Sequence, residues 1–255
     1  MYKLYLLSIL YCCGQIIKSD YKEEANDLIE SYILLERLKT PENFNRILTD
    51  SSSFGYYLQH LPLKPIDSKV LLYNGETKEN NDIYCAVVNM DIGKKDLQQC
   101  ADACMRLRAE YLYHKKRYKD IQFKFVADNK WHTYLDYIKQ DYSYKKFRLY
   151  MEYVFNYANT ASLKKQLSTV PFYQMEIGDV LVQSVNPYGH AVIIVDICEN
   201  MKGEKQYMLA QSYMPAQETQ ILVNPNTLKP WFNKPDGSVI NTPEWTFDTA
   251  DLKRW

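Results

Sequence analysis

The stretch from Ile177 to Gln217 constrains the fold more than any other part of this sequence. It holds three short apolar runs separated by two turn-rich segments, a pattern typical of an antiparallel meander. The runs are Val180–Gln183, Ala191–Asp196 and Tyr207–Gln211, and the turns are Asn186–Gly189 and Glu199–Glu204. We therefore expect three neighbouring antiparallel strands in this stretch.

Two polar residues lie where neighbouring strands of this meander meet. His190 opens the middle strand and Gln211 ends the next one. Adjacent strands lie about 4.8 Å apart, so the two side chains can contact each other. An amide oxygen beside an imidazole fixes the imidazole tautomer, as the third group of a nucleophilic site does. Asp196 is an alternative partner, but six residues of strand place it about 20 Å from His190, which favours Gln211.

A helix upstream of the meander supplies a candidate nucleophile. Apolar residues recur at three- and four-residue spacing over 96–114, and Asp96 is the expected cap of the first turn. Cys100 falls in the first turns, where the helix dipole and free N–H groups favour a thiolate. We predict Cys100 as nucleophile and His190 as its base.

The remaining roles follow from this pair. Gln211 is predicted to hold the imidazole, and Gln98 or Gln99 to donate to an oxyanion together with the Cys100 N–H. Two alternatives stay open for the helix thiols. Cys100 could be an ordinary buried thiol of an amphipathic helix, and Cys104, one turn further on, could serve as the nucleophile.

Charge and cysteine spacing exclude other kinds of site. Lys plus Arg and Asp plus Glu number 31 each, so no net positive charge gathers nucleic acid. The cysteines form no Cys-x-x-Cys pair, and we expect neither a metal nor another cofactor. A disulfide between Cys85 and Cys198 is compatible with an oxidising compartment. The sequence does not indicate an oligomeric state.

The first nineteen residues have the composition of a secretory signal. One early lysine precedes an apolar run, 4–13, that is too short to span a bilayer and is followed by small and polar residues. We expect residues 1–19 to be removed and the protein to be exported to the periplasm or cell envelope. Cys13 is an alternative point of lipid attachment. No transmembrane segment is expected in the mature chain.

Residues 20–255 are expected to form a single α+β domain. Helices are predicted over 20–39, after Ser53, and over 131–138 and 143–158, with short strands at 70–73, 84–90 and 121–126. The last thirty-odd residues, from Asn224, are rich in proline, and irregular chain is expected there.

The order of the candidate residues resembles that of papain-like cysteine hydrolases, more narrowly the NlpC/P60 and CHAP-type cell-wall hydrolases. Those proteins carry a Gly-Asp strand followed by a Gly-His strand, here Gly178-Asp179 and Gly189-His190. The resemblance implies a helix packed on an antiparallel sheet, with N-terminal and middle helical additions. It also implies peptide or cell-wall fragments as substrates.

Four further segments resemble DUF4846, a family of exported Bacteroidetes proteins for which no activity is implied. They are LPLKP (61–65), DLQQCADACMRLRAEYLY (96–113), GHAVIIVD (189–196) and LAQSYMPAQ (209–217). Two hypotheses follow from the sequence. The chain is a thiol hydrolase of peptide or amide bonds, or a non-catalytic exported protein of the same fold that binds peptide or glycan.

Overall fold

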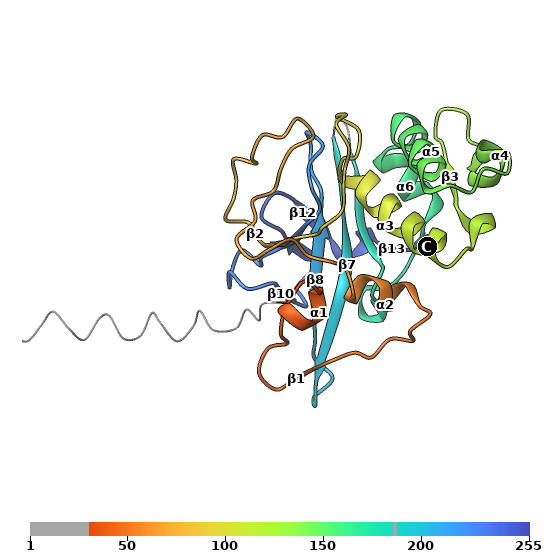
Figure 1. Ribbon diagram of the computed structural model, residues 1–255. Coiled ribbons are helices and arrows are strands. Elements are labelled where there is room, and N and C mark those ends of the chain that lie inside the picture. Colours follow the sequence, from red (N-terminus) through yellow and green to blue (C-terminus); the bar gives the residue numbers. More distant parts are fainter. Residues whose placement is uncertain (1–30, 186–187) are drawn as a thin grey trace, which may run out of the picture.

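The computed structural model describes residues 31–185 and 188–255 (Figure 1). This part of the chain is of the α+β class, as expected, with one large antiparallel sheet and helices packed on it. The predicted signal, residues 1–19, lies outside the described residues, as does the first half of the helix expected over 20–39. The described half of that segment contains only the short helix α1, Leu34–Arg37.

Nine strands of the described residues form the main sheet, whose central order is β2-β9-β8-β7-β6-β13-β5. Its strands are β2 (Tyr84–Val87), β9 (Gln220–Leu222), β8 (Lys205–Gln211), β7 (Gly189–Asn200), β6 (Val180–Ser184), β13 (Leu252–Arg254) and β5 (Ser168–Thr169). β1 (Phe44–Arg46) pairs with the far end of β7, and β10 (Trp231–Asn233) pairs with β8. Two hairpins lie outside this sheet, β3 (Gln122–Lys124) with β4 (Trp131–Thr133), and β11 (Val239–Asn241) with β12 (Thr246–Asp248).

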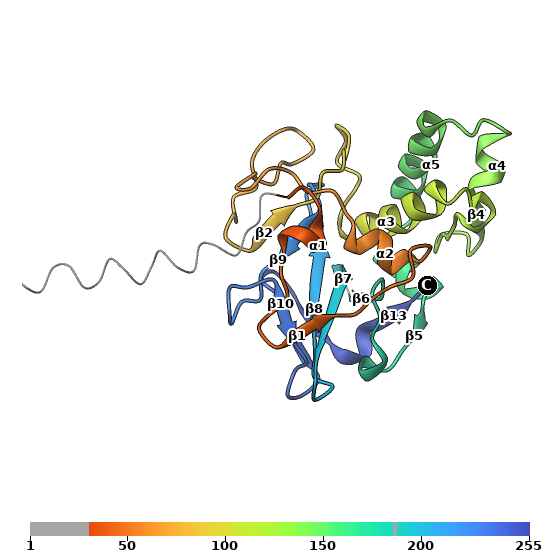
Figure 2. The ribbon, with the colours of Figure 1, turned by 60° about the horizontal axis from the view of Figure 1, so that its bottom comes forward.

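The helices gather on one side of the sheet, as Figures 1 and 2 show. They are α2 (Phe54–Gln59), α3 (Cys100–His114), α4 (Tyr134–Ile138), α5 (Tyr144–Tyr157) and α6 (Thr160–Gln166). Short 3₁₀ turns follow at Tyr118–Asp120, Phe172–Gln174 and Thr249–Asp251. Two helices begin where the sequence predicts them, and each has a serine cap at its start. Ser53 accepts from the Tyr56 N–H, and Ser143 accepts from the Lys146 N–H. Among the described residues, no helix has both the length and the apolar composition of a membrane span.

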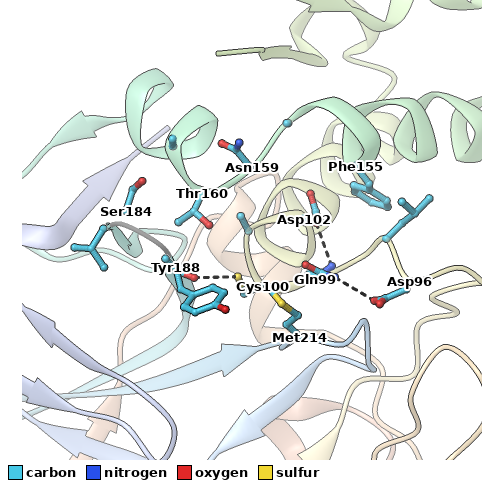
Figure 3. Close-up of a pocket in the computed structure, with 16 residues that line it drawn as sticks. Asp96, Gln99, Cys100, Asp102, Phe155, Asn159, Thr160, Ser184, Tyr188 and Met214 are labelled. Carbon is cyan, nitrogen blue, oxygen red and sulfur yellow. Dashed lines mark hydrogen bonds between the residues drawn. The ribbon is translucent and has the colours of Figure 1, made fainter. Parts of the chain in front are cut away.

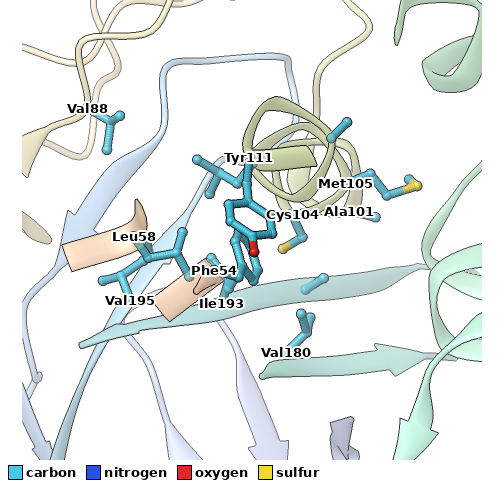
Figure 4. Close-up of a cluster of buried hydrophobic side chains, with 14 of the residues drawn as sticks. Phe54, Leu58, Val88, Ala101, Cys104, Met105, Tyr111, Val180, Ile193 and Val195 are labelled. Carbon is cyan, nitrogen blue, oxygen red and sulfur yellow. The ribbon is translucent and has the colours of Figure 1, made fainter. Parts of the chain in front are cut away.

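The predicted meander is present as β6, β7 and β8, and β7 separates two cores. Ala191, Ile193 and Val195 face α2 and α3 and belong to the larger core (Figure 4). Val192 and Ile194 point the other way, into a smaller core with residues of the C-terminal hairpin. Successive side chains of a strand point to opposite faces, so β7 is buried on both sides.

Buried ion pairs fix the helices and the long strand. Arg106 and Glu110 on α3 are paired at 2.6 Å and are almost fully buried. Asp196, the rejected alternative to Gln211, accepts from Arg46 at 2.6 Å and from Gln59 at 2.7 Å. The Asp196 carboxylate is therefore occupied by Arg46 and Gln59, away from His190.

Several expectations from the sequence are wrong in detail. α3 begins at Cys100 and not at Asp96, since the Asp96 carboxylate instead accepts from the Ala216 N–H and from Gln99. Residues 131–133 are the strand β4, and only 134–138 are helical. The segment 70–73 makes isolated bridges to Thr77 and Gln217 and no regular strand.

The cysteines and the C-terminal tail also differ from the expectation. Cys85 and Cys198 are both free thiols, so the disulfide between them is absent. The tail expected to be irregular contains β10 to β13. Its strands are three residues long, too short to show periodicity in a sequence.

Candidate active site

Cys100 is the first residue of α3 and lies at the edge of a cavity of about 310 Å³. Gln99 before it is extended, and the Gln99 N–H donates to a carboxylate oxygen of Asp102 at 3.1 Å, which starts the helix. The Cys100 Sγ lies 4.0 Å from the carbonyl oxygen of Gly189 on β7. Figure 3 shows this sulfur among Thr160, Tyr188 and Met214 on the wall of the cavity. The thiol is therefore next to the strand that carries His190.

The electrostatic environment of the Cys100 thiol opposes ionisation. Burial and the neighbouring Asp102 raise its pKa, whereas the N–H groups of Ala101 and Ala191 lower it by less. The net shift of the Cys100 pKa is upward, opposite in direction to the activation expected at a helix N-terminus. A thiol of this kind is protonated at neutral pH.

Asp102 on the first turn of α3 also lines the cavity. Its Oδ2 accepts from the Gln99 N–H, and its Oδ1 is buried without a partner among the described residues. Burial raises the pKa of this carboxyl well above its ordinary value. Burial thus disfavours a negative charge on the Asp102 carboxyl, as it does on the neighbouring thiol.

His190 and Gln211 are brought together as the sequence predicts. The His190 Nε2 lies 2.9 Å from the Gln211 Oε1, and both side chains are almost fully buried. Gln211 in turn donates through its Nε2 to Glu244 at 2.6 Å, and Glu244 is paired with Lys78 at 2.8 Å. A chain of polar groups thus runs from Lys78 to the imidazole.

This chain determines the tautomer of His190. A carboxylate only accepts hydrogen bonds, so the amide nitrogen of Gln211 must face Glu244 and its oxygen must face His190. The His190 Nε2 is then the protonated nitrogen, and Nδ1 carries the free lone pair. The imidazole is held in the tautomer that accepts a proton at Nδ1.

Aromatic rings surround the His190 imidazole. The ring centroids of Tyr213, Trp245 and Phe247 lie 4.9, 5.5 and 5.8 Å from it. Burial lowers the pKa of His190 to about 4, and the hydrogen bond to Gln211 only partly opposes this effect. His190 is neutral at neutral pH, and so is the thiol on the other side of the strand.

The thiol and the imidazole are neighbours but are not bonded to each other. Cys100 contacts peptide groups on both sides of His190, the carbonyl of Gly189 and the N–H of Ala191. The His190 side chain extends to the opposite face, against Phe247 of the smaller core. Within the described part of the chain, no hydrogen bond joins the Cys100 Sγ to the His190 ring. The resting structure therefore holds a separated pair.

The two predicted oxyanion donors and the alternative thiol have different positions. Gln99 lines the cavity, but its Nε2 donates to Asp96 at 3.1 Å. Gln98 is buried, and its Oε1 accepts from Arg106 at 3.1 Å. Cys104 points into the larger core between α3 and the sheet (Figure 4). Of these three residues, only Gln99 lies next to the cavity.

Lys78 and Glu244 are site residues that the sequence reasoning missed. They stand 166 positions apart, one in a polar loop and one in the proline-rich tail. A lysine or glutamate in such a segment is normally exposed, so neither carries a local signal of burial. Only the fold brings them to Gln211.

The described residues contain no group of three or more His, Cys, Asp and Glu side chains arranged to hold a metal ion. Fold and site together define an α+β protein with a buried helix-terminal thiol beside an oriented, neutral imidazole. The chain belongs to the family described as domain of unknown function (4846), DUF4846, whose model matches residues 34–140 and 126–254. No curated protein and no solved structure matches it significantly.

Proposed function

We propose that this protein is an exported thiol hydrolase of peptide or amide bonds. Cys100 is the nucleophile, His190 the base and Gln211 the residue that orients the base. The observation that supports this most is the hydrogen-bond chain from Lys78 through Glu244, because it favours the tautomer in which the His190 Nδ1 is unprotonated. The thiol contacts the peptide groups on both sides of this residue. Export is proposed from the composition of residues 1–19.

The order of a helix thiol, a strand histidine and an amide is similar to that of papain-like hydrolases of the NlpC/P60 and CHAP types. Cell-wall peptides are the proposed substrate class on that similarity. The cavity beside Cys100 is about 310 Å³, at the lower end of the range for small-ligand sites. It accommodates a few residues of a peptide and not a large folded partner.

The chemistry begins from a neutral thiol and a neutral imidazole. On substrate binding, Cys100 leaves the Gly189 carbonyl, and the thiol must move past the edge of β7 to reach the face on which the His190 ring lies. There it transfers its proton to the His190 Nδ1, and the thiolate attacks the scissile carbonyl carbon. The amine departs with the proton from His190, leaving an acyl-thioester on Cys100. A water molecule, deprotonated by His190, then hydrolyses the thioester and restores the thiol. Gln211 holds the imidazolium through its Oε1 in both steps.

The proposal is tested with a muramidase digest of peptidoglycan as substrate and mass spectrometry of the products. The wild type is expected to cleave stem peptides, and Cys100→Ala and His190→Ala to reduce the rate at least 10³-fold. Cys104→Ala is the matched control, because it removes a thiol from the same helix without touching the cavity. Equal cleavage by Cys100→Ala and wild type would exclude the thiol mechanism.

A second candidate function is non-catalytic binding of peptide or glycan in the same cavity. The observation that favours it is the separation of the protonated thiol from the imidazole. It predicts that wild type and Cys100→Ala bind the same peptidoglycan fragments with equal affinity by calorimetry and that neither forms a product. Product formation by the wild type alone would reject it.

A further inference from the structure

A second cavity, of about 150 Å³, lies on a different part of the described structure. Residues of α3, β3, β4 and the end of α6 form it, together with Trp255, which follows β13. Its walls include Arg108, Leu112, Phe123, Trp131, Gln166 and Trp255. Arg108 is eight residues beyond Cys100 on α3, about 12 Å along the helix, and it does not line the first cavity. The two sites are therefore separate.

The guanidinium group of Arg108 is packed among aromatic rings and lacks an anionic partner. Its central carbon lies 5.0 Å from the Phe54 ring, 5.4 Å from the Tyr111 ring and 5.9 Å from the Trp255 ring. Among the described residues it makes no ion pair and no side-chain hydrogen bond. Burial lowers the pKa of Arg108, because a desolvated cation without a counterion is unfavourable.

The acidic residue in the wall of this cavity is already engaged. Asp120 lines the cavity, but its carboxylate accepts from the Arg117 Nε at 2.7 Å. Arg117 is about half exposed, so this ion pair lies toward solvent. The charge of Arg108 is thus left for a ligand.

Two further donors in the same walls are also unsatisfied. The Gln166 Nε2 and the Trp255 Nε1 are buried and have no hydrogen-bond partner in the described structure. The Oε1 of Gln166 accepts from the Lys124 N–H at 3.2 Å, so the amide nitrogen is the end without a partner. Buried donors in proteins are nearly always satisfied, and here two of them line the cavity that Arg108 lines.

We propose that this cavity binds a compact organic carboxylate, with Arg108 as its primary contact. A carboxylate matches the planar fork of a guanidinium in shape and charge. Gln166 and Trp255 complete the site when their side chains turn slightly toward the ligand oxygens. Leu112, Phe123 and the half-exposed Trp131 provide apolar walls for a short hydrocarbon part. A phosphate dianion fits less well, because Asp120 would repel its second charge.

The test is an NMR titration of the full chain with sodium propionate, followed through the arginine Nε–H and tryptophan indole signals. The Arg108 and Trp255 signals, assigned with the variants Arg108→Gln and Trp255→Phe, are expected to shift saturably. Propionamide, which has the same shape without the charge, is expected to bind at least tenfold more weakly. Sodium phosphate at the same ionic strength is expected to cause no saturable shift.

Two variants test which residue holds the ligand. Arg108→Gln should weaken propionate binding at least tenfold. The matched control is Arg148→Gln, which removes an arginine of α5 that does not line the cavity and should retain propionate binding. The inference is overturned if propionamide binds as well as propionate, if phosphate binds in its place, or if Arg108→Gln leaves the affinity unchanged. The comparison of propionate with propionamide uses only the wild type and does not depend on the stability of a variant. It is also independent of any hydrolytic activity of Cys100.

Discussion

The burial of His190 makes the stability of the protein depend on pH in a predictable way. Its pKa is lowered from 6.5 to about 4 in the folded protein. Between these values the unfolded chain binds a proton that the folded chain does not bind, so acidification favours unfolding. The contribution is fully present above pH 6.5 and is lost as the pH falls to 4. At about 1.4 kcal/mol per pH unit, the loss amounts to about 3 kcal/mol.

The perturbation that isolates this effect is His190→Gln. A glutamine can donate to the Gln211 Oε1 as the imidazole does, and it does not titrate. The variant is expected to be less stable than wild type at pH 7, because the ring leaves a gap among Tyr213, Trp245 and Phe247. Between pH 7 and pH 4, however, it should lose about 3 kcal/mol less than the wild type.

The assay is urea unfolding followed by tryptophan fluorescence at pH 7 and pH 4, at constant ionic strength. The quantity compared between the variants is the loss of unfolding free energy from pH 7 to pH 4. Carboxylates titrate equally in both proteins, so the difference between them reports His190 alone. His114→Gln, which removes an exposed imidazole, is the matched control and should follow the wild type. If wild type and His190→Gln lose stability in parallel, the imidazole is not buried in its neutral form.

Three further predictions concern neighbouring groups. Lys78→Met and Glu244→Gln each leave a buried charge or amide without its partner, so each should lower the free energy of unfolding by about 3 kcal/mol or more. In a double-mutant cycle, the double variant should lose less than the sum of the two single losses. Additive losses would mean that the polar chain does not act as a unit. Gly178→Ala should destabilise by more than about 1 kcal/mol in thermal unfolding, because φ is +101° and the new Cβ would lie 2.8 Å from Phe54; an unchanged melting temperature would contradict this. Cys100 should react with iodoacetamide more slowly than the unfolded chain at pH 7 and should accelerate only at a more alkaline pH than the unfolded chain does, since its pKa is raised. Rapid alkylation at neutral pH, measured by intact mass, would show that the thiol is already ionised.

The sequence predicts the meander and the contact of His190 with Gln211 because both depend on local order. Three apolar runs with short turns leave few arrangements other than neighbouring antiparallel strands. The two side chains then stand at the same end of adjacent strands, and the structure places them 2.9 Å apart. The start of α2 after Ser53 was predictable for the same reason, since the cap that Ser53 supplies depends on residues next to each other in the chain.

The face of the sheet on which His190 lies was not predictable in this way. A strand with one buried face alternates apolar and polar residues, and the alternation shows which side chains point inward. β7 is buried on both faces, so Ala191 to Val195 form an unbroken apolar run. Such a run does not show which side chains point to which face. The side of the strand that receives α3 is set by contacts far away in the sequence. The partners Lys78 and Glu244 were missed for the same reason.

The position of Cys100 beside β7 has a consequence for how a peptide would enter the proposed site. The Ile194 peptide groups bond to Gly178 and Asp179 on the β6 side, so by alternation those of Gly189 and Ala191 point to the β8 side. Pairing with β8 begins only at Ile193, and the Cys100 thiol contacts the free edge beyond it.

An extended peptide that adds along this edge would take over the Gly189 carbonyl and the Ala191 N–H, which releases the thiol toward the imidazole. Hydrogen exchange of the Ala191 amide in Cys100→Ala should therefore slow at least tenfold when a stem peptide is bound, with the Ile193 amide as the unchanged reference. An Ala191 amide that exchanges equally fast with and without bound peptide would rule out entry along this edge.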